Sequence, residues 1–254
     1  MKKDFNSEDL RDEYKGYYES YRVAYLKGHP DCDRRLCEAY AARMVRRRAQ
    51  KLYDYRQILD KINANAELQD ILPLHKSCAE RGCDGGYYKI LQDILSEAKT
   101  VFDICCGLNP CMIAEEFPNI DEYFCYDRDA RISKLLQILN EKHLSSKLSV
   151  LSDDMWNDDM MSQLQPDVVL AQKLIPNLFY SHNTKITDRI AQINAKYWFV
   201  SGAIYSLSRN VSIQKDERTA LEWFIGHYGF QKIKYVQTHS EFGWILSKPD
   251  RSTS

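Results

Sequence analysis

Several features that would assign this chain to a specialised class are missing from its sequence. It has no run of about 18 uncharged apolar residues, and no apolar segment follows the charged N-terminus as it would in a secretion signal. The 8 cysteines include no Cys-x-x-Cys pair and no further Cys or His at a spacing that suits zinc. We therefore expect a cytoplasmic protein with reduced thiols, no membrane contact and no bound metal.

Net charge is also nearly absent, at −1 over 254 residues, so the chain as a whole is not a polycation. Hydrophobic residues make up 44% and charged residues 28%, which is ordinary for a globular protein. The length suits one α/β domain, or such a domain with an appendage. Any affinity for a polyanion must therefore come from a local segment.

One such segment spans residues 34–51, where seven basic residues and one acidic residue give a local charge of about +6. The segment lacks Gly and Pro, and its apolar residues recur at the spacing of an amphipathic helix. A solvated helix face and a phosphate-contacting patch both explain this composition. The candidate RNA-binding residues are Arg34, Arg35, Arg43, Arg46, Arg47, Arg48 and Lys51.

The apolar pattern changes near residue 75. Helical periodicity dominates before it, over 8–25 and 33–63, whereas strand-like runs alternate with helical segments after residue 100. The expected strands are 100–105, 123–126, 148–151, 168–171, 197–201, 230–236 and 242–246, and the clearest later helices are 131–142, 184–194 and 217–228. This order predicts an α/β fold over 75–254, a Rossmann-like mixed sheet with its last strand antiparallel, behind an N-terminal helical domain over 1–74.

The segment DICCGLNP, residues 103–110, follows the first expected strand, where ligands bind in sheets of this kind. A dinucleotide loop needs several glycines so that the pyrophosphate can approach a helix N-terminus. Here only Gly107 is present, and Pro110 has no N–H to offer. Asp127 ends the second strand about 20 residues further on, where an acid can bind ribose hydroxyls. The loop therefore favours a nucleoside ligand without phosphates, such as S-adenosyl-L-methionine.

Three ordered blocks resemble one family: HKSCAER (75–81), DICCGLNP (103–110) and QKLIPNL (172–178). They are similar to motifs of the aminoglycoside-resistance methyltransferases, which methylate N7 of a guanine in 16S rRNA of the small ribosomal subunit. The resemblance covers residues 75–246, because 200–209, 217–224 and 240–246 also fit the closing part of that family. It implies a class I S-adenosylmethionine-dependent methyltransferase whose N-terminal helical domain helps to bind the ribosome.

Residue by residue, the resemblance implies a cofactor site and a target-base site. Arg81 would hold the methionine carboxylate, Asp127 the ribose hydroxyls, and Asp153 or its neighbour the adenine amino group. Lys173, Leu174 and Pro176 would face the methyl group and the target base as catalytic residues. The expected cofactor-binding residues are His75, Ser77, Arg81, Asp103, Cys105, Gly107, Asp127, Asp153, Asp154 and Gln172.

Taken singly, these residues have ordinary structural explanations as well. Asp127 could be a helix N-cap, Arg81 a surface charge, and Asp103 a structural carboxylate at a strand end. The chain also departs from the family pattern on the target side, because Gly202 and Tyr205 stand where the family has an aromatic and a basic residue. Tyr205 could instead stack on an RNA base.

Three functions therefore stay open. The first is guanine-N7 methylation of 16S rRNA, and the second is methylation of another RNA base or of a small molecule at N or O. The third is a catalytically silent binding protein on the same scaffold. We expect a monomer whose partner is the small ribosomal subunit.

Overall fold

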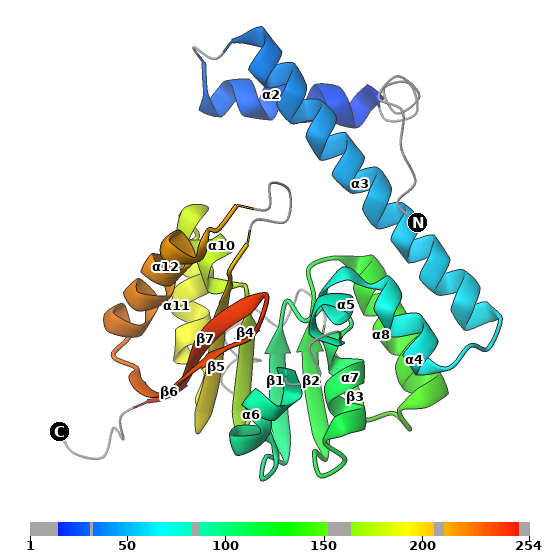
Figure 1. Cartoon of the computed structure of the whole chain (residues 1–254), viewed down its shortest axis with the longest axis vertical. Coiled ribbons are helices and arrows are strands. Elements are labelled where there is room, and N and C mark those ends of the chain that lie inside the picture. The colour runs from blue at the N-terminus through cyan, green and yellow to red at the C-terminus, as the bar shows by residue number, and fades with distance from the viewer. Residues whose placement is uncertain (1–14, 31–32, 83–86, 152–163, 206–210, 249–254) are drawn as a thin grey trace. The chain divides into compact units, whose positions relative to one another are not determined.

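The computed structural model describes residues 15–30, 33–82, 87–151, 164–205 and 211–248 (Figure 1). By packing, the chain divides into two compact units, Met1–Asn65 and Ala66–Ser254. The sequence pattern places the boundary between the helical and the α/β domains after residue 74, and this boundary stays a prediction. In the structure, residues 66–74 pack with the second unit.

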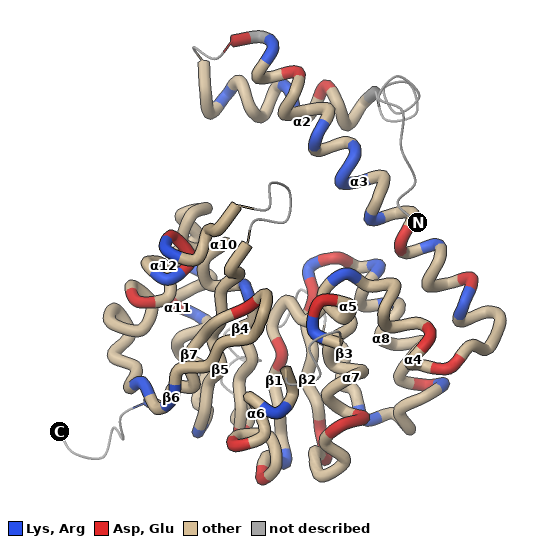
Figure 2. The backbone as a smooth tube through the Cα atoms, in the orientation of Figure 1, with Lys and Arg blue, Asp and Glu red and all other residues tan. Residues whose placement is uncertain are grey.

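Over its described residues, the first unit consists of two helices, α2 (Lys15–Gly28) and α3 (Arg34–Asn63). Asp33 caps α3, because its carboxylate accepts the Arg35 N–H at 2.7 Å. Tyr18 of α2 packs with Ala41, Val45 and Ala49, the small buried side chains of α3. Lys and Arg residues recur along α3 (Figure 2). Both helices expected in this part of the chain are confirmed for the described residues.

The second unit contains a seven-stranded sheet in the order β3-β2-β1-β4-β5-β7-β6. Strands β1 to β5 pair in parallel, and β7 runs antiparallel to both β5 and β6. The predicted mixed sheet is therefore confirmed, with each strand within one or two residues of its expected position. The strands are β1 Thr100–Ile104, β2 Glu122–Tyr126, β3 Leu148–Val150, β4 Val168–Gln172, β5 Tyr197–Ala203, β6 Gln231–Gln237 and β7 Glu241–Ser247.

Helices connect and cover these strands. The three expected from periodicity are confirmed as α8 (Ala130–His143), α11 (Thr184–Gln192) and α12 (Gln214–His227). The other helices of the described ranges are α4 Leu68–Ile71, the 3-10 helix η1 Leu72–Leu74, α5 Lys76–Gly82, α6 Tyr87–Leu95, α7 Asn109–Glu116 and α10 Ile175–Tyr180. Among the helices of the described ranges, none is long and apolar enough to cross a membrane.

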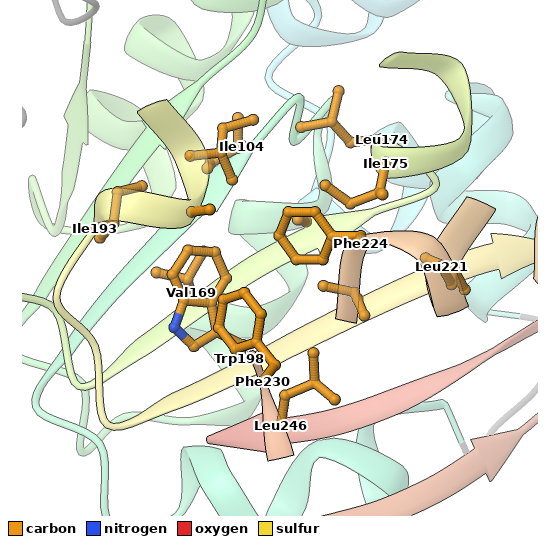
Figure 3. Close-up of a cluster of buried hydrophobic side chains, with 14 of the residues drawn as sticks. Ile104, Val169, Leu174, Ile175, Ile193, Trp198, Leu221, Phe224, Phe230 and Leu246 are labelled. Carbon is orange, nitrogen blue, oxygen red and sulfur yellow. The ribbon is translucent and has the colours of Figure 1, made fainter. Parts of the chain in front are cut away.

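The main hydrophobic core lies between one face of the sheet and helices α10, α11 and α12 (Figure 3). Trp198 of β5 and Phe224 of α12 are fully buried, and both rings lie close to Phe230, at 5.1 and 5.2 Å between centroids. Burying a side chain of this size stabilises the fold by about 2–3 kcal/mol. The core thus fixes the carboxyl ends of β1, β4 and β5, where the candidate site begins.

Candidate functional site

The loop after β1 is held in a conformation that depends on glycine. Cys105 and Gly107 both adopt left-handed backbone angles, with φ of 59° and 58°, and the Cys105 N–H donates to the Tyr126 carbonyl at 2.7 Å. A Cβ on Gly107 would lie 2.7 Å from Cε1 of His75 and 3.2 Å from Oγ of Ser77. The structure therefore brings His75, Ser77 and Gly107 together at one end of the sheet, and only glycine fits there.

Asp127 stabilises this loop from the end of β2. Its carboxylate accepts the Gly107 N–H at 2.9 Å and the Asp129 N–H at 2.9 Å. The N-cap of α8 is Asp129, whose side chain accepts the Arg131 N–H, so the N-cap explanation for Asp127 is wrong. Asp127 is thus placed beside the loop, and its role toward a ribose stays a prediction.

Arg81 is not a surface charge. It is only 5% exposed, and its Nε and Nη2 both donate to Oε2 of Glu241 at 3.2 Å. The Tyr87 ring lies 5.0 Å from the centre of the guanidinium. Burial alone would raise the pKa of Glu241, but Arg81 and Lys173 outweigh it and hold that pKa below its usual range. The pair is therefore ionised, and it is anchored in the interior.

Lys173 extends the same charged cluster to the end of β4. Its Nζ lies 3.1 Å from Oε2 of Glu80 and 3.5 Å from Oε2 of Glu241. The Lys173 backbone N–H donates to Oγ of Ser201 at 3.1 Å, and that hydroxyl donates to Oε1 of Glu241. Glu241 begins the antiparallel strand β7, so it lies at the same edge as the carboxyl ends of β4 and β5.

A second group of polar side chains is buried next to this cluster. The Asn109 amide donates to Oδ2 of Asp103 and to Oε1 of Gln172, both at 3.4 Å. Tyr87 donates to Gln172 at 2.6 Å, and Tyr123 donates to Asp103 at 3.0 Å. Burial raises the pKa of Asp103 to about 7, although Arg81 and these donors oppose the shift. Asp103 is therefore a structural carboxylate at least in part.

Three buried polar atoms in this group have no hydrogen-bond partner among the described residues: Oδ1 of Asp103, Oδ1 of Asn109 and Nε2 of Gln172. Each such atom costs on the order of 1–3 kcal/mol when it stays unpaired. Two acceptors and one donor, with the Arg81 guanidinium nearby, fit the ammonium and carboxylate of an amino acid. In the same described ranges, no group of three His, Cys, Asp or Glu could hold a metal ion.

The residues expected on the target side are less uniform. Lys173 is 22% exposed, whereas Leu174 belongs to the main core and Pro176 is buried at the start of α10. Tyr205 is 44% exposed, and its ring centroid lies 6.4 Å from that of His239. Their roles toward a target base stay predictions, and Tyr205 is the one whose ring is open to a partner.

Gly202 makes room for a carboxylate that the sequence did not single out. A Cβ there would lie 2.9 Å from Cβ of Glu217, and Oε2 of Glu217 accepts the Ala203 N–H at 3.1 Å. This is the position where the family pattern has an aromatic side chain, so Glu217 takes part of that space. Asp153 and Asp154 lie outside the described residues.

The basic segment forms the first half of α3. Arg43 is half-buried, the side chain of Arg34 is not described, and the exposed members are Arg35, Arg46, Arg47, Arg48 and Lys51. The Arg48 guanidinium lies 3.7 Å from the centre of the Tyr17 ring. Within the described residues, no ion pair joins an exposed member to a carboxylate, and Asp54 instead accepts from Gln50 at 2.6 Å.

No protein-family model and no curated protein matches this chain. Among solved structures, it is similar to the 16S rRNA methylase ArmA, with a TM-score of 0.62 and 21% identity over 77% of this chain and 98% of that one. An rRNA methylase from Escherichia coli is similar with a TM-score of 0.61 and 17% identity, over 96% of this chain and 100% of that one. The 16S rRNA methyltransferase RmtF, in complex with S-adenosyl-L-homocysteine, is similar with a TM-score of 0.61 and 17% identity, over 98% of this chain and 100% of that one.

These similarities show the fold, which is that of the class I S-adenosylmethionine-dependent methyltransferases, as the sequence blocks imply. The second and third similarities also include residues of the first unit, because Ala66–Ser254 alone is a smaller share of the chain.

Proposed function

We propose that this protein is an S-adenosylmethionine-dependent methyltransferase that methylates N7 of a guanine in 16S rRNA of the small ribosomal subunit. The observation that carries the proposal is the set of unpaired buried polar atoms on Asp103, Asn109 and Gln172, next to Arg81. They lie where class I methyltransferases bind a ligand, at the carboxyl edge of the sheet. The similarity in fold to rRNA methylases supports the choice of substrate.

The described residues fit the amino-acid end of the cofactor. Oδ1 of Asp103 and Oδ1 of Asn109 would accept from its ammonium, and Arg81 would donate to its carboxylate. Asp127 would bind the ribose hydroxyls, with Asp153 or Asp154 at the adenine. Bound there, S-adenosylmethionine supplies an electrophilic methyl group on a sulfonium.

The chain's own part in the reaction is to position the target base. N7 of guanine has a free lone pair and no proton, so no general base is needed and orientation supplies most of the rate enhancement. Lys173, Leu174 and Pro176 follow β4 and would face the base. A base in folded RNA has to leave its stack to reach such a site, and Tyr205 would then stack on it.

The exposed face of α3 would bind the RNA backbone. Contacts between arginine and phosphate do not depend on sequence and weaken as salt rises, so this face would supply affinity, not the choice of base. Because the proposed substrate is the small ribosomal subunit, we propose that the protein acts in the cytoplasm. We also propose that it acts as a monomer.

The experiment is incubation with labelled S-adenosylmethionine and isolated small subunits, followed by mapping of the modified base. We expect one labelled guanine, with N7 identified by cleavage of the RNA at that base, and no label with the Arg81→Ala variant. Aminoglycoside resistance of cells that express the protein is a second readout. Turnover of a metabolite but not of subunits would assign a small-molecule methyltransferase. Absence of cofactor binding would assign a binding protein.

A further inference from the structure

Arg81 has two of its three guanidinium nitrogens occupied by one side chain. Nε and Nη2 donate to Glu241, whereas Nη1 makes no hydrogen bond to a described residue. A guanidinium is planar, so the carboxylate on the edge of Nε and Nη2 fixes the direction in which the remaining edge points. In a side chain that is only 5% exposed, this remaining edge is the part left for a ligand.

Glu241 is itself held from several directions. It is 1% exposed and accepts from Ser201, its Oε1 lies 3.4 Å from the Tyr87 hydroxyl, and Lys173 lies 3.5 Å away. Three groups of the described residues thus offer donors to this carboxylate: Arg81, Lys173 and Ser201. A glutamine would put an N–H₂ donor in place of one acceptor oxygen, and it would also leave Arg81 and Lys173 with one counter-charge fewer. The cluster is thus built for a carboxylate at this position.

We propose that Glu241 is the positioning residue that orients Arg81 toward the carboxylate of the bound cofactor. This inference rests on the proposed function, because it takes the ligand of Arg81 to be the amino-acid end of S-adenosylmethionine. Glu241 touches neither the cofactor nor the target base, and it acts through Arg81. Its place at the start of β7 lets the antiparallel strand contribute to a site otherwise built from the ends of parallel strands and from helices α5, α6 and α7.

Charge supports orientation as the role. Arg81 is already paired with Glu241, and Lys173 lies between Glu241 and Glu80, which Lys76 also approaches at 4.0 Å. A ligand carboxylate therefore meets a guanidinium that already has a counter-charge, and its affinity depends on well-aimed hydrogen bonds. An Arg81 side chain released from Glu241 would have to be ordered again by each ligand, at a cost in affinity.

The test is calorimetry of the full chain with two ligands. S-adenosylhomocysteine carries the amino-acid end, and 5′-methylthioadenosine has the same nucleoside part without it. We expect Glu241→Gln to weaken S-adenosylhomocysteine by roughly tenfold or more, as removal of an orienting partner does elsewhere, and to leave methylthioadenosine unchanged. The matched control is Glu222→Gln, an exposed carboxylate paired with Lys232, which should change neither affinity.

A double-mutant cycle completes the test. In an Arg81→Ala background, Glu241→Gln should cause no further loss of S-adenosylhomocysteine affinity, because its effect passes through Arg81. Equal weakening of both ligands would show a general structural role and overturn the proposal, as would unchanged or tighter binding of S-adenosylhomocysteine. If the unmodified protein binds neither ligand, the proposed function itself fails, and the inference fails with it.

Discussion

The two units of the chain carry positive charge in opposite ways. On α3, Arg46, Arg47 and Arg48 are exposed, and within the described residues no carboxylate pairs with them. In the second unit, Arg81 and Lys173 are buried or half-buried and are paired with Glu241 and Glu80. An exposed, unpaired cation can meet any phosphate, and salt screens that contact. A buried, paired cation is held in one direction by its partner, so it can serve only a group that lies in that direction.

The largest effect is expected from reversing the charge on α3, which removes the exposed cations from the first unit. Replacing Arg46, Arg47 and Arg48 with Glu should weaken binding of small subunits by about 100-fold at low salt. The slope of log affinity against log salt concentration should become shallower by up to roughly 3, because binding no longer releases the counterions of each phosphate contact that is lost. Filter binding at several salt concentrations measures both effects. S-adenosylhomocysteine affinity should stay unchanged, because the described residues that we propose to bind the cofactor belong to the other unit.

The control reverses three exposed cations that are already paired: Lys99, Lys232 and Lys234, whose partners are Asp121, Glu222 and Asp93. It makes the same change in net charge, so an equal loss of subunit binding would show that the effect belongs to the whole molecule. Undiminished methylation by the α3 variant would show that this face of the helix is a solvated surface and not an RNA-binding one. That result would also strengthen the small-molecule alternative.

A smaller loss is expected at Asp127. The Ala variant loses the proposed ribose contact and the hydrogen bond from the Gly107 N–H, so S-adenosylhomocysteine should bind about 1–3 kcal/mol more weakly in calorimetry. Asp127→Asn keeps an acceptor for the Gly107 N–H, so its affinity for S-adenosylhomocysteine should lie between those of the unmodified protein and the Ala variant. Asp129→Ala removes the α8 N-cap two residues away, and should lower stability by about 1 kcal/mol with cofactor affinity retained. Unchanged affinity in Asp127→Ala would remove the assignment.

Local patterns in the sequence were enough for most of the fold. The strands are short apolar runs, the long helices have a period of 3.6 residues, and Gly107 and Pro110 mark the loop that follows β1. Helices such as α5 and α10 span two turns or fewer, which is too short for a period to show. The antiparallel strand was predicted because two strand-like runs follow α12 with a short turn between them.

The polar cluster could not be predicted in the same way. Arg81 and Glu241 are separated by 160 residues, and a single sequence holds no record of which distant side chains meet. Glu241 had one weak signal, an acid at the start of an apolar strand. The sequence also does not show whether a charged residue is buried, so it left open that Arg81 was a surface charge, whereas the structure places it in an internal ion pair. The exact start of α8 is equally hidden, and it makes Asp129 the N-cap in place of Asp127.

The buried part of the site should also respond to pH through Asp103. Its pKa is raised to about 7 in the folded protein, so this group is protonated over a range where the unfolded chain is ionised. It therefore lowers stability as pH rises from about 4 to 7. A ligand ammonium needs the ionised form, so S-adenosylhomocysteine affinity should rise up to about tenfold per pH unit below 7 and level off above it.

Calorimetry at several pH values checks this dependence, and Asp103→Asn is the matched control. The variant cannot ionise at this position, so its affinity should be lower at pH 8 and nearly flat with pH. The same slope in both proteins would assign the titration to another group. In contrast to α3, changes in salt should have little effect on this binding, because the carboxylate is fully buried.

The smallest effect is expected at Cys105, whose backbone N–H donates to the Tyr126 carbonyl and whose sulfur we expect to take no part in the chemistry. Desolvation and the nearby carboxylates of Asp127 and Asp103 raise the pKa of the thiol to about 12, so it is a poor nucleophile and a poor metal ligand at neutral pH. Cys105→Ala should keep methylation of small subunits within a few-fold. Cys105→Val should lose more activity and stability, because a β-branched side chain is strained at a φ of 59°. Complete loss of activity in the Ala variant, or stoichiometric zinc in the purified protein, would contradict a purely backbone role and show that the Cys105 sulfur takes part in the chemistry.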